Sequence, residues 1–245
     1  MITSRKNPLI QQLRRLLNSR KEREAAGLFV SDGTKLLKEA IQWWPQLETV
    51  FLTENVEIDL PNTVEKVMVS PEIMEYVSPM QTPQGALFVC RLPENQAFCP
   101  QKGMLLLDGI QDPGNVGTIL RTADALGVPV ALLEGCADPY SHKVVRSSMG
   151  AVFRTQVVQT TWELAGAAMK AANIPVAVTA LSDSAQDIRD ASLPDMAVVI
   201  GSEGQGVRQQ ILDETEHQLI IPMNPNCESL NAAIAAAIVM WQMKK

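Results

Sequence analysis

The sequence lacks the features that mark several large classes of protein. Its four cysteines, Cys90, Cys99, Cys136 and Cys227, form no CxxC pair, so they are interpreted as packing or incidental residues and no metal site is expected. No apolar run approaches the ~20 residues that cross a membrane. Neither the GxGxxG fingerprint nor a P-loop occurs, which argues against the common dinucleotide and triphosphate folds.

The composition that remains is that of a globular protein. The 245 residues are 46% hydrophobic and 20% charged, enough for one large domain or two small ones. The N-terminus, MITSRKNPLIQQLRRLLNSRK, contains no apolar signal core, so a cytoplasmic protein without a membrane partner is expected. Its basic amphipathic character leaves a transit peptide as an alternative.

Charge is distributed unevenly along the chain. The net charge is −6, yet residues 1–24 carry seven basic side chains and two acidic ones. A basic arm on an acidic body is a common arrangement for contact with a phosphate backbone. A solvated helix face is the alternative, and charge alone does not separate the two.

The first half of the sequence reads as a small α/β unit. Helices are predicted at 9–17, at 34–43 and from Ser70 onwards, and short strands at 28–30, 49–52, 67–69 and 86–90. Residues 92–102 carry two prolines and little periodicity. The predicted organisation is an N-terminal domain at 1–95, a linker at 96–102 and a second domain at 103–245.

In the second half, apolar strands alternate with helices. Such strands predict a mostly parallel sheet with helices on both faces, and ligands of these sheets bind beyond the carboxyl ends of the strands. The predicted strands are 104–107, 130–133, 156–158, 176–181, 196–200 and 219–221, and the predicted helices are 115–126, 141–149, 162–172 and 229–243.

Three loops that follow strands carry the polar and glycine residues expected of a ligand site. The first, from Asp108, leads into a helix on which Arg121 lies off the apolar stripe; the second is Gly201–Gly206; the third runs from Ile221 to Asn231. Each has a simpler interpretation: a surface arginine, a tight turn, and Ser229 as a helix cap.

Together the three loops resemble the motifs of the SpoU (TrmH) family of RNA ribose 2′-O-methyltransferases, in the SPOUT superfamily. DPGNVGTILRTADALG resembles the first motif, VVIGSEGQGV the second, and IPM followed by ESLNAA the third. Order and separation agree, so the resemblance covers about 103–245. FVSDGTKLLKEA resembles the family's substrate-binding domain. This chain has Ser31-Asp32-Gly33 where the family's usual sequence is Val-Glu-Gly.

The resemblance implies a C-terminal trefoil knot, an N-terminal α/β domain similar to RNA-binding ribosomal proteins, and S-adenosylmethionine bound in the knot. It also implies a homodimer that completes the active site across its interface. The Ala-rich helix Asn231–Ala237 suits that interface, with burial inside one subunit as the alternative. The implied cofactor-binding residues are Leu181, Ser182, Gly201, Ser202, Gly204, Gly206, Ile221, Met223, Ser229 and Leu230.

For catalysis the resemblance places Arg121 nearest the reacting hydroxyl, as the family's proposed general base. A guanidinium keeps its positive charge and has no acceptor for a proton, so Arg121 is instead expected to clamp the adjacent phosphate and stabilise the developing alkoxide. Asn115 and Glu203 are expected to position it, while Ser229 and Asn231 shape the ribose and cofactor pockets.

The expected function is methylation of a ribose 2′-hydroxyl in structured RNA, with ribosomal RNA favoured over transfer RNA by analogy. A non-catalytic RNA-binding protein of the same fold and an open-sheet oxidoreductase are the rival interpretations. His142 and His217 are assigned no chemistry. The expected RNA-binding residues are Arg5, Lys6, Arg14, Arg15, Arg20, Lys21 and Arg146.

Overall fold

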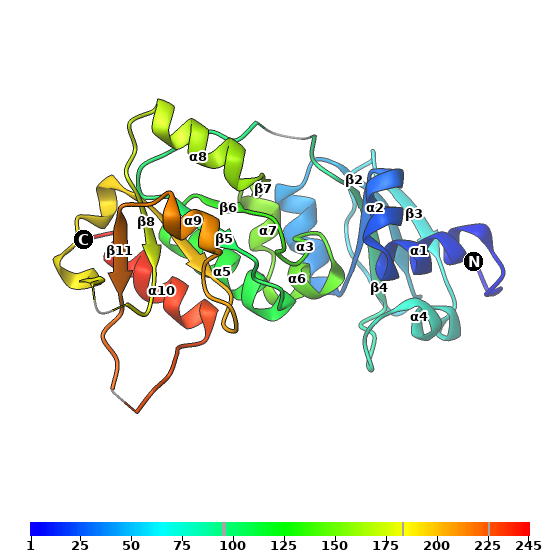
Figure 1. Cartoon of the computed structure of the whole chain (residues 1–245). Coiled ribbons are helices and arrows are strands. Elements are labelled where there is room, and N and C mark those ends of the chain that lie inside the picture. The colour runs from blue at the N-terminus through cyan, green and yellow to red at the C-terminus, as the bar shows by residue number, and fades with distance from the viewer. Residues whose placement is uncertain (95–96, 183, 225) are drawn as a thin grey trace. The chain divides into compact units, whose positions relative to one another are not determined.

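The computed structural model describes residues 1–94, 97–182, 184–224 and 226–245. These residues form two compact units: unit 1 is Met1–Glu94 with Asp138–Arg154, and unit 2 is Asn95–Ala137 with Thr155–Lys245 (Figure 1). Residues 95 and 96, at the predicted domain boundary and linker, and Pro225, in the third loop, lie outside the described residues.

Unit 1 is built on a four-stranded sheet with the order β1-β4-β2-β3. Strand β4 runs antiparallel to β1 and β2, and β3 runs parallel to β2. Helices α1 and α4 cover one face through an apolar cluster that includes Val30, Phe51 and Leu87. The elements are α1 (Pro8–Asn18), α2 (Arg20–Ala26), β1 (Leu28–Asp32), α3 (Thr34–Trp43), β2 (Leu47–Leu52), β3 (Glu65–Met68), α4 (Pro71–Val77) and β4 (Ala86–Arg91).

Residues 138–154 cover the other face of this sheet, although the sequence predicts them in the second domain. They form α6 (His142–Ser147) and α7 (Ala151–Arg154). The ring of Phe29 in β1 lies 5.2 Å from that of Tyr140 and 6.3 Å from that of Phe153. Among the described residues, Tyr140 and Phe153 are two of the three aromatic rings that pack against Phe29, so burial of aromatic surface explains why this segment belongs to unit 1.

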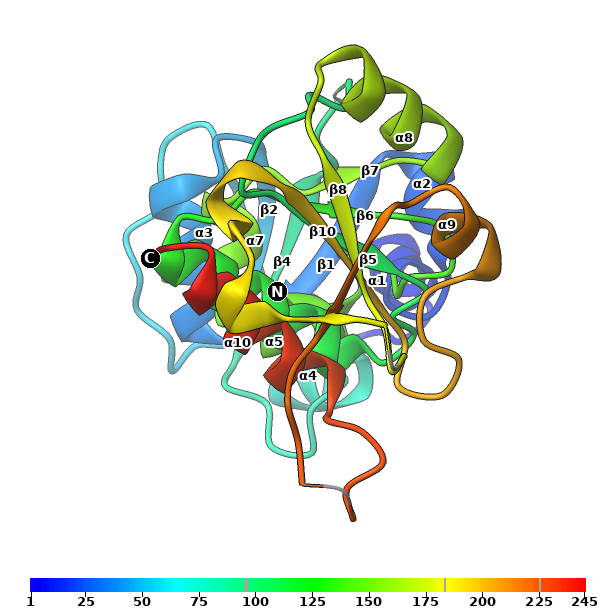
Figure 2. The same ribbon diagram turned by 60° about the vertical axis from the view of Figure 1, so that its left-hand side comes forward.

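Unit 2 contains a seven-stranded sheet with the order β7-β6-β5-β10-β8-β11-β9, and every neighbouring pair is parallel. The predicted parallel α/β sheet is thus confirmed. Helices α8 and α9 pack on one face, and α5 and α10 lie together on the other (Figure 2). The elements are β5 (Leu105–Asp108), α5 (Pro113–Leu126), β6 (Val130–Leu132), β7 (Val158–Gln159), α8 (Trp162–Ala171), β8 (Val176–Thr179), β9 (Gln186–Asp187), η1 (Ile188–Asp190), η2 (Leu193–Asp195), β10 (Ala197–Gly201), α9 (Gln209–Asp213), β11 (His217–Ile220) and α10 (Ala232–Gln242).

Two helix starts differ from the sequence prediction. Helix α5 is capped by Asp112, whose side chain accepts from the Asn115 backbone N–H. Helix α10 begins at Ala232 rather than Ser229, and Asn231 caps it by accepting from the backbone N–H groups of Ala233 and Ile234. Asparagine is among the strongest N-cap residues. The interpretation of Ser229 as the cap is therefore wrong, and its hydroxyl is not committed to the helix end.

Across the described ranges, no helix is long and apolar enough to span a membrane. The same part of the chain contains no cluster of three or more His, Cys, Asp or Glu side chains arranged to hold a metal ion.

Candidate active site

The loops after β5, β8, β10 and β11 come together at the carboxyl edge of the unit 2 sheet. Because these four strands are parallel and adjacent in the sheet, their carboxyl ends lie at one edge. Beside this edge is a cavity of about 640 Å³, within the range of small-molecule sites. Residues that are far apart in the sequence therefore share one pocket.

All ten residues expected to bind the cofactor line this cavity. They come from three segments: the loop after β8, the glycine loop after β10, and the loop between β11 and α10. The residues are Leu181, Ser182, Gly201, Ser202, Gly204, Gly206, Ile221, Met223, Ser229 and Leu230.

A hydrogen-bond network connects the three sequence motifs next to the cavity. The Asn115 amide of α5 donates to Glu203 Oε1 in the glycine loop. Asn231 Nδ2 in turn donates to Asn115 Oδ1 at 3.0 Å. Glu203 Oε1 also accepts from the Ala232 backbone N–H at 3.3 Å, which places a carboxylate at the N-terminus of α10. The network fixes the glycine loop relative to both helices.

The glycine loop is folded tightly on itself. Ser202 and Gly206 exchange two backbone hydrogen bonds of 3.2 and 2.9 Å. A Cβ atom at Gly201 would lie 2.0 Å from the Gly206 carbonyl carbon, so only glycine allows the two ends of the loop to meet. A simple tight turn does not require two backbone segments to pack this closely. The close packing therefore favours the interpretation of the loop as a wall of the cavity.

Arg121 does not line this cavity. It lies with Thr118 and Thr122 along a separate groove of about 660 Å³ between α5 and α10. The α10 side of the groove carries Ile234 and Trp241, which are 52% and 64% exposed. Of the five expected catalytic residues, Glu203 and Ser229 line the cavity, Asn115 and Asn231 belong to the adjoining network, and Arg121 faces the groove.

Helix α10 has one face buried inside the subunit and another face exposed. Ala232, Ala233 and Ala236 are buried inside the subunit, as the simpler interpretation of the Ala-rich helix requires. Ile234 and Trp241 remain exposed on its outer face. Burial and an exposed apolar face therefore occur on the same helix.

The sequence interpretation missed several cavity residues that lie on α9 and β11. Gln209 and Asp213 line the cavity, and Gln209 Nε2 donates to Asp213 Oδ1 at 2.7 Å. Leu212 and Gln218 line it as well. The spacing of Gln209 and Asp213, one helical turn apart directly after the glycine loop, is the signal that indicates them.

Cys136 lies next to the first loop but is not suited to covalent chemistry. Its Sγ donates to the Leu107 carbonyl at 3.2 Å. Burial raises the pKa of the Cys136 thiol to about 11, so the thiol stays protonated at neutral pH. The chemistry of this site must come from other groups.

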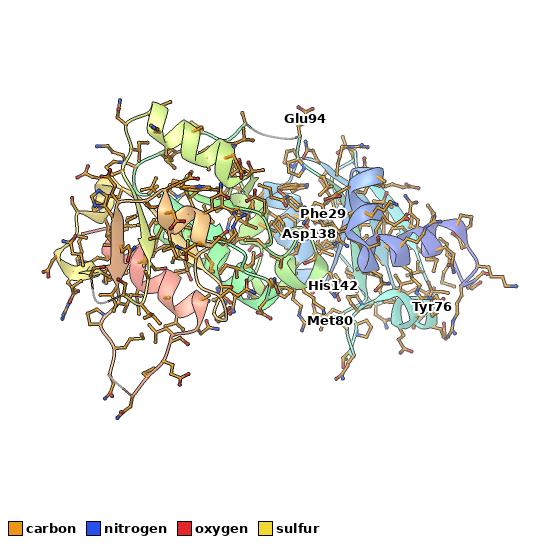
Figure 3. All side chains as sticks on the ribbon, in the orientation of Figure 1. Phe29, Tyr76, Met80, Glu94, Asp138 and His142 are labelled. Carbon is orange, nitrogen blue, oxygen red and sulfur yellow. The ribbon has the colours of Figure 1, made fainter. Side chains whose placement is uncertain are left out.

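The expected RNA-binding residues all belong to unit 1 and all are exposed. Arg5 and Arg14 both lie over the ring of Tyr76, with guanidinium carbons 4.6 and 4.5 Å from its centroid. Figure 3 labels Tyr76 on α4. Arg23, by contrast, is buried and donates to Asp138 from Nε at 2.9 Å. One charge of the basic arm is therefore neutralised within the fold.

Arg146 lies beside a second carboxylate of unit 1. It contacts the Met80 sulfur and lines a small cavity with Asp32 and Gly33. Burial raises the pKa of Asp32, and the hydrogen bond from Ser78 and the charge of Arg146 act in the opposite direction. Arg146 is thus partly engaged within its own unit.

Comparisons with known proteins agree with this arrangement. The model of the SpoU rRNA Methylase family matches residues 102–241, and that of the MRM3-like substrate binding domain matches residues 7–87. A Bacillus subtilis protein named 23S rRNA (guanosine(2553)-2′-O)-methyltransferase RlmP is 32% identical over 99% of this chain and 98% of its own length.

Two solved structures match almost the whole chain. An AdoMet-bound rRNA methyltransferase from Sinorhizobium meliloti has a TM-score of 0.87 at 26% identity, covering 99% of this chain and 96% of that one. The SpoU methyltransferase AviRb from Streptomyces viridochromogenes, in complex with AdoMet, has a TM-score of 0.86 at 25% identity, covering 98% and 97%.

Proposed function

The chain belongs to the SpoU rRNA methylase family, and on this premise we propose that it methylates a ribose 2′-hydroxyl of ribosomal RNA with S-adenosylmethionine as methyl donor. The observation that carries the proposal is the network of Asn115, Glu203 and Asn231 beside the cavity, because it unites all three motifs of the family. An N-terminal substrate-binding domain supports an RNA substrate.

The cavity suits S-adenosylmethionine in size and chemistry. Its glycine loop and the Ile221–Met223 segment offer backbone groups, and Leu181 and Leu230 offer apolar surface. Asp213, held by Gln209, adds a carboxylate suited to hydroxyl or ammonium groups. When bound, the cofactor would supply a methyl group activated by its sulfonium charge. The protein's own task is to align the ribose oxygen and handle one proton.

We propose that Arg121 stabilises the reacting ribose electrostatically. A guanidinium carries a fixed positive charge and five N–H donors with no acceptor, so Arg121 is better suited to clamp a phosphate and a developing alkoxide than to remove a proton. Asn115, Glu203 and Asn231 hold the loops that frame the ribose, and Ser229 offers a hydroxyl to the same region. Proton removal then falls to a phosphate oxygen or to water.

The position of Arg121 supports a homodimer. Arg121 lines the groove between α5 and α10 rather than the cavity of its own chain. The exposed Ile234, Ile238 and Trp241 make this face apolar, as expected of a surface that a second copy covers. In such a dimer each subunit would supply Arg121 to the cavity of the other.

The basic N-terminal arm and α4 are the proposed RNA contact of unit 1. Arg5 and Arg14 stack on Tyr76, which holds both charges at one exposed position. Lys6, Arg15, Arg20, Lys21 and Arg146 extend the positive surface. Phosphate contacts of this kind give affinity without sequence preference.

We also propose the family's C-terminal trefoil knot and a cytoplasmic location. The knot is supported by the way loops after β8, β10 and β11 contribute to one cavity, as the family's cofactor site requires. The location is supported by relatives that are named for bacterial ribosomal RNA.

Calorimetric titration and a methyl-transfer assay together test the proposed function. In the titration, the purified chain should bind S-adenosylhomocysteine and not NAD. In the assay, it should transfer labelled methyl groups to ribosomal RNA, and the label should be recovered in 2′-O-methylated nucleotides. Transfer to tRNA alone would reassign the substrate. A chain that binds RNA but does not bind the cofactor would favour a non-catalytic RNA-binding protein.

A further inference from the structure

Asp108 is a buried carboxylate that does not line the cavity. It ends β5, and its register partner is Gly201, the first residue of the glycine loop. Figure 2 shows β5 and β10 beside each other near the centre of unit 2. The Asp108 side chain is 1% exposed. A charge buried this deeply is costly unless it is paired, so its partners indicate what it stabilises.

Both Asp108 oxygens accept from one residue, Arg208. The Arg208 backbone N–H donates to Oδ2 at 2.8 Å, and Arg208 Nε donates to Oδ1 at 2.6 Å. Arg208 Nη2 also donates to Glu134 Oε2 at 2.7 Å. The carboxylate therefore fixes both the backbone and the side chain of Arg208.

Arg208 follows directly on the segment that closes the glycine loop. Gly206 and Val207 pack against Gly201 so closely that a Cβ atom there would overlap their backbone. Asp108 pairs with Gly201 at the loop's entry and holds the Arg208 N–H just after its exit. The end of β5 thus fixes both ends of the loop.

We propose that Asp108 and Arg208 are positioning residues that hold the Gly201–Gly206 loop in the shape that accepts S-adenosylmethionine. This inference rests on the proposed function, because it assigns a purpose to the same cavity. Neither residue lines the cavity, so both act through the loop. Their action should appear in cofactor affinity more than in the chemical step.

The first test compares Asp108→Asn with Asp138→Asn. Both carboxylates accept from an arginine Nε and from a backbone N–H, but the partners of Asp138 are Arg23 and Tyr140 in unit 1. Asn replaces an acceptor with an NH₂ group that faces donors. Asp108→Asn should raise the Kd for S-adenosylhomocysteine and the KM for S-adenosylmethionine by about tenfold or more. At saturating cofactor, kcat should stay within about threefold of wild type. Asp138→Asn should leave the Kd for S-adenosylhomocysteine and the KM for S-adenosylmethionine unchanged.

A second pair of variants keeps the test decisive if Asp108→Asn folds poorly. Arg208→Lys keeps the backbone bond and the charge but loses the bond from Nε, so a smaller rise in Kd is expected. Glu134→Gln keeps an acceptor oxygen and should bind cofactor like wild type.

Two outcomes would overturn the inference in distinguishable ways. Wild-type affinity in Asp108→Asn and Arg208→Lys, with a melting temperature lowered as in Asp138→Asn, would leave these residues a structural role only. A wild-type chain that binds no S-adenosylhomocysteine would overturn the proposed function itself, and this inference with it.

Discussion

Individual residues at the site act mainly through polar side chains that hold one another in place. Asn115 accepts from Asn231 and donates to Glu203, so each amide is used on both sides. Glu203 and Asn231 are exposed, so these hydrogen bonds compete with water, and they act by favouring one arrangement of the loops more than by adding stability. Substitutions here should therefore separate activity from stability.

Asn231 has two roles that two substitutions can distinguish. Asn231→Ser keeps a good helix cap but loses the Nδ2 donor to Asn115, so the melting temperature should stay near that of wild type while methyl transfer falls. Asn231→Ala loses both roles, and the free energy of unfolding should fall by about 1 kcal/mol as well. Thermal melts and turnover of the two variants check this; full activity in Asn231→Ser would show that the network is dispensable.

Arg121→Lys tests the electrostatic role. A lysine cannot reproduce the planar bidentate fork, so turnover should drop by about 100-fold or more. Binding of S-adenosylhomocysteine should be unchanged, because the proposed partners of Arg121 are the ribose and phosphate of the RNA rather than the cofactor. Retained turnover that rises steeply with pH, as the lysine loses its proton, would instead support a general base.

His142 gives unit 1 a predictable response to pH. Its pKa is lowered, mainly by burial, and its Nδ1 has no hydrogen-bond partner among the described residues. Below the unfolded pKa of ~6.5 the unfolded chain binds more protons, so stability should fall as pH falls from there towards the folded pKa. His142→Gln should remove this slope in denaturant titrations. The exposed His217→Gln is the matched control, and an unchanged slope in His142→Gln would contradict the assignment.

Some of these residues were predictable from the sequence and others were not. Glu203 and Ser229 stand in loops whose glycine and turn residues indicate a ligand site. Asp108 and Arg208 are separated by 100 positions and meet only because β5 and β10 are neighbours in the sheet. Strand order is a long-range property that local patterns do not carry.

At the scale of elements, α5 and α10 combine two tasks. Each packs against the other and contributes to the network at its N-terminal end. Their outer faces leave an apolar groove that contains Arg121. One pair of helices thus connects the cavity with the proposed dimer surface.

Mixed dimers test whether Arg121 acts across that surface. Arg121→Ala and Gly201→Ala should each be inactive, because the first loses the charge and the second disrupts the loop. Tag-purified dimers with one copy of each should recover about half of wild-type activity if each cavity takes Arg121 from the other subunit. Dimers of a single variant are the control, and no recovery in the mixed dimer would place Arg121 in its own subunit's site.

Most elements follow from local sequence patterns, and the exceptions have physical reasons. The seven-stranded sheet was predictable in kind because its strands are apolar and alternate with helices. The short β9 has only two residues, too few for periodicity to indicate. The packing of α6 and α7 on unit 1 depends on Phe29 and Phe153, whose contact joins distant segments.

The whole molecule pairs a substrate-binding unit with a methyltransferase unit. Positive charge concentrates in residues 1–24 of a chain whose net charge is −6, which suits the proposed RNA contact through unit 1 and cofactor binding within unit 2. The sequence indicates these two functional units, because the substrate-binding domain matches residues 7–87 and the methylase family matches residues 102–241.

Nucleotide-resolution mapping of 2′-O-methylation shows whether the chain methylates a ribose of ribosomal RNA. RNA from cells that lack the gene should lose methylation at a ribosomal position. The wild-type gene should restore it, and the Arg121→Lys variant should not. An unchanged ribosomal map would show that the chain does not methylate ribosomal RNA, and restoration by Arg121→Lys equal to that by wild type would show that Arg121 has no electrostatic role in the reaction.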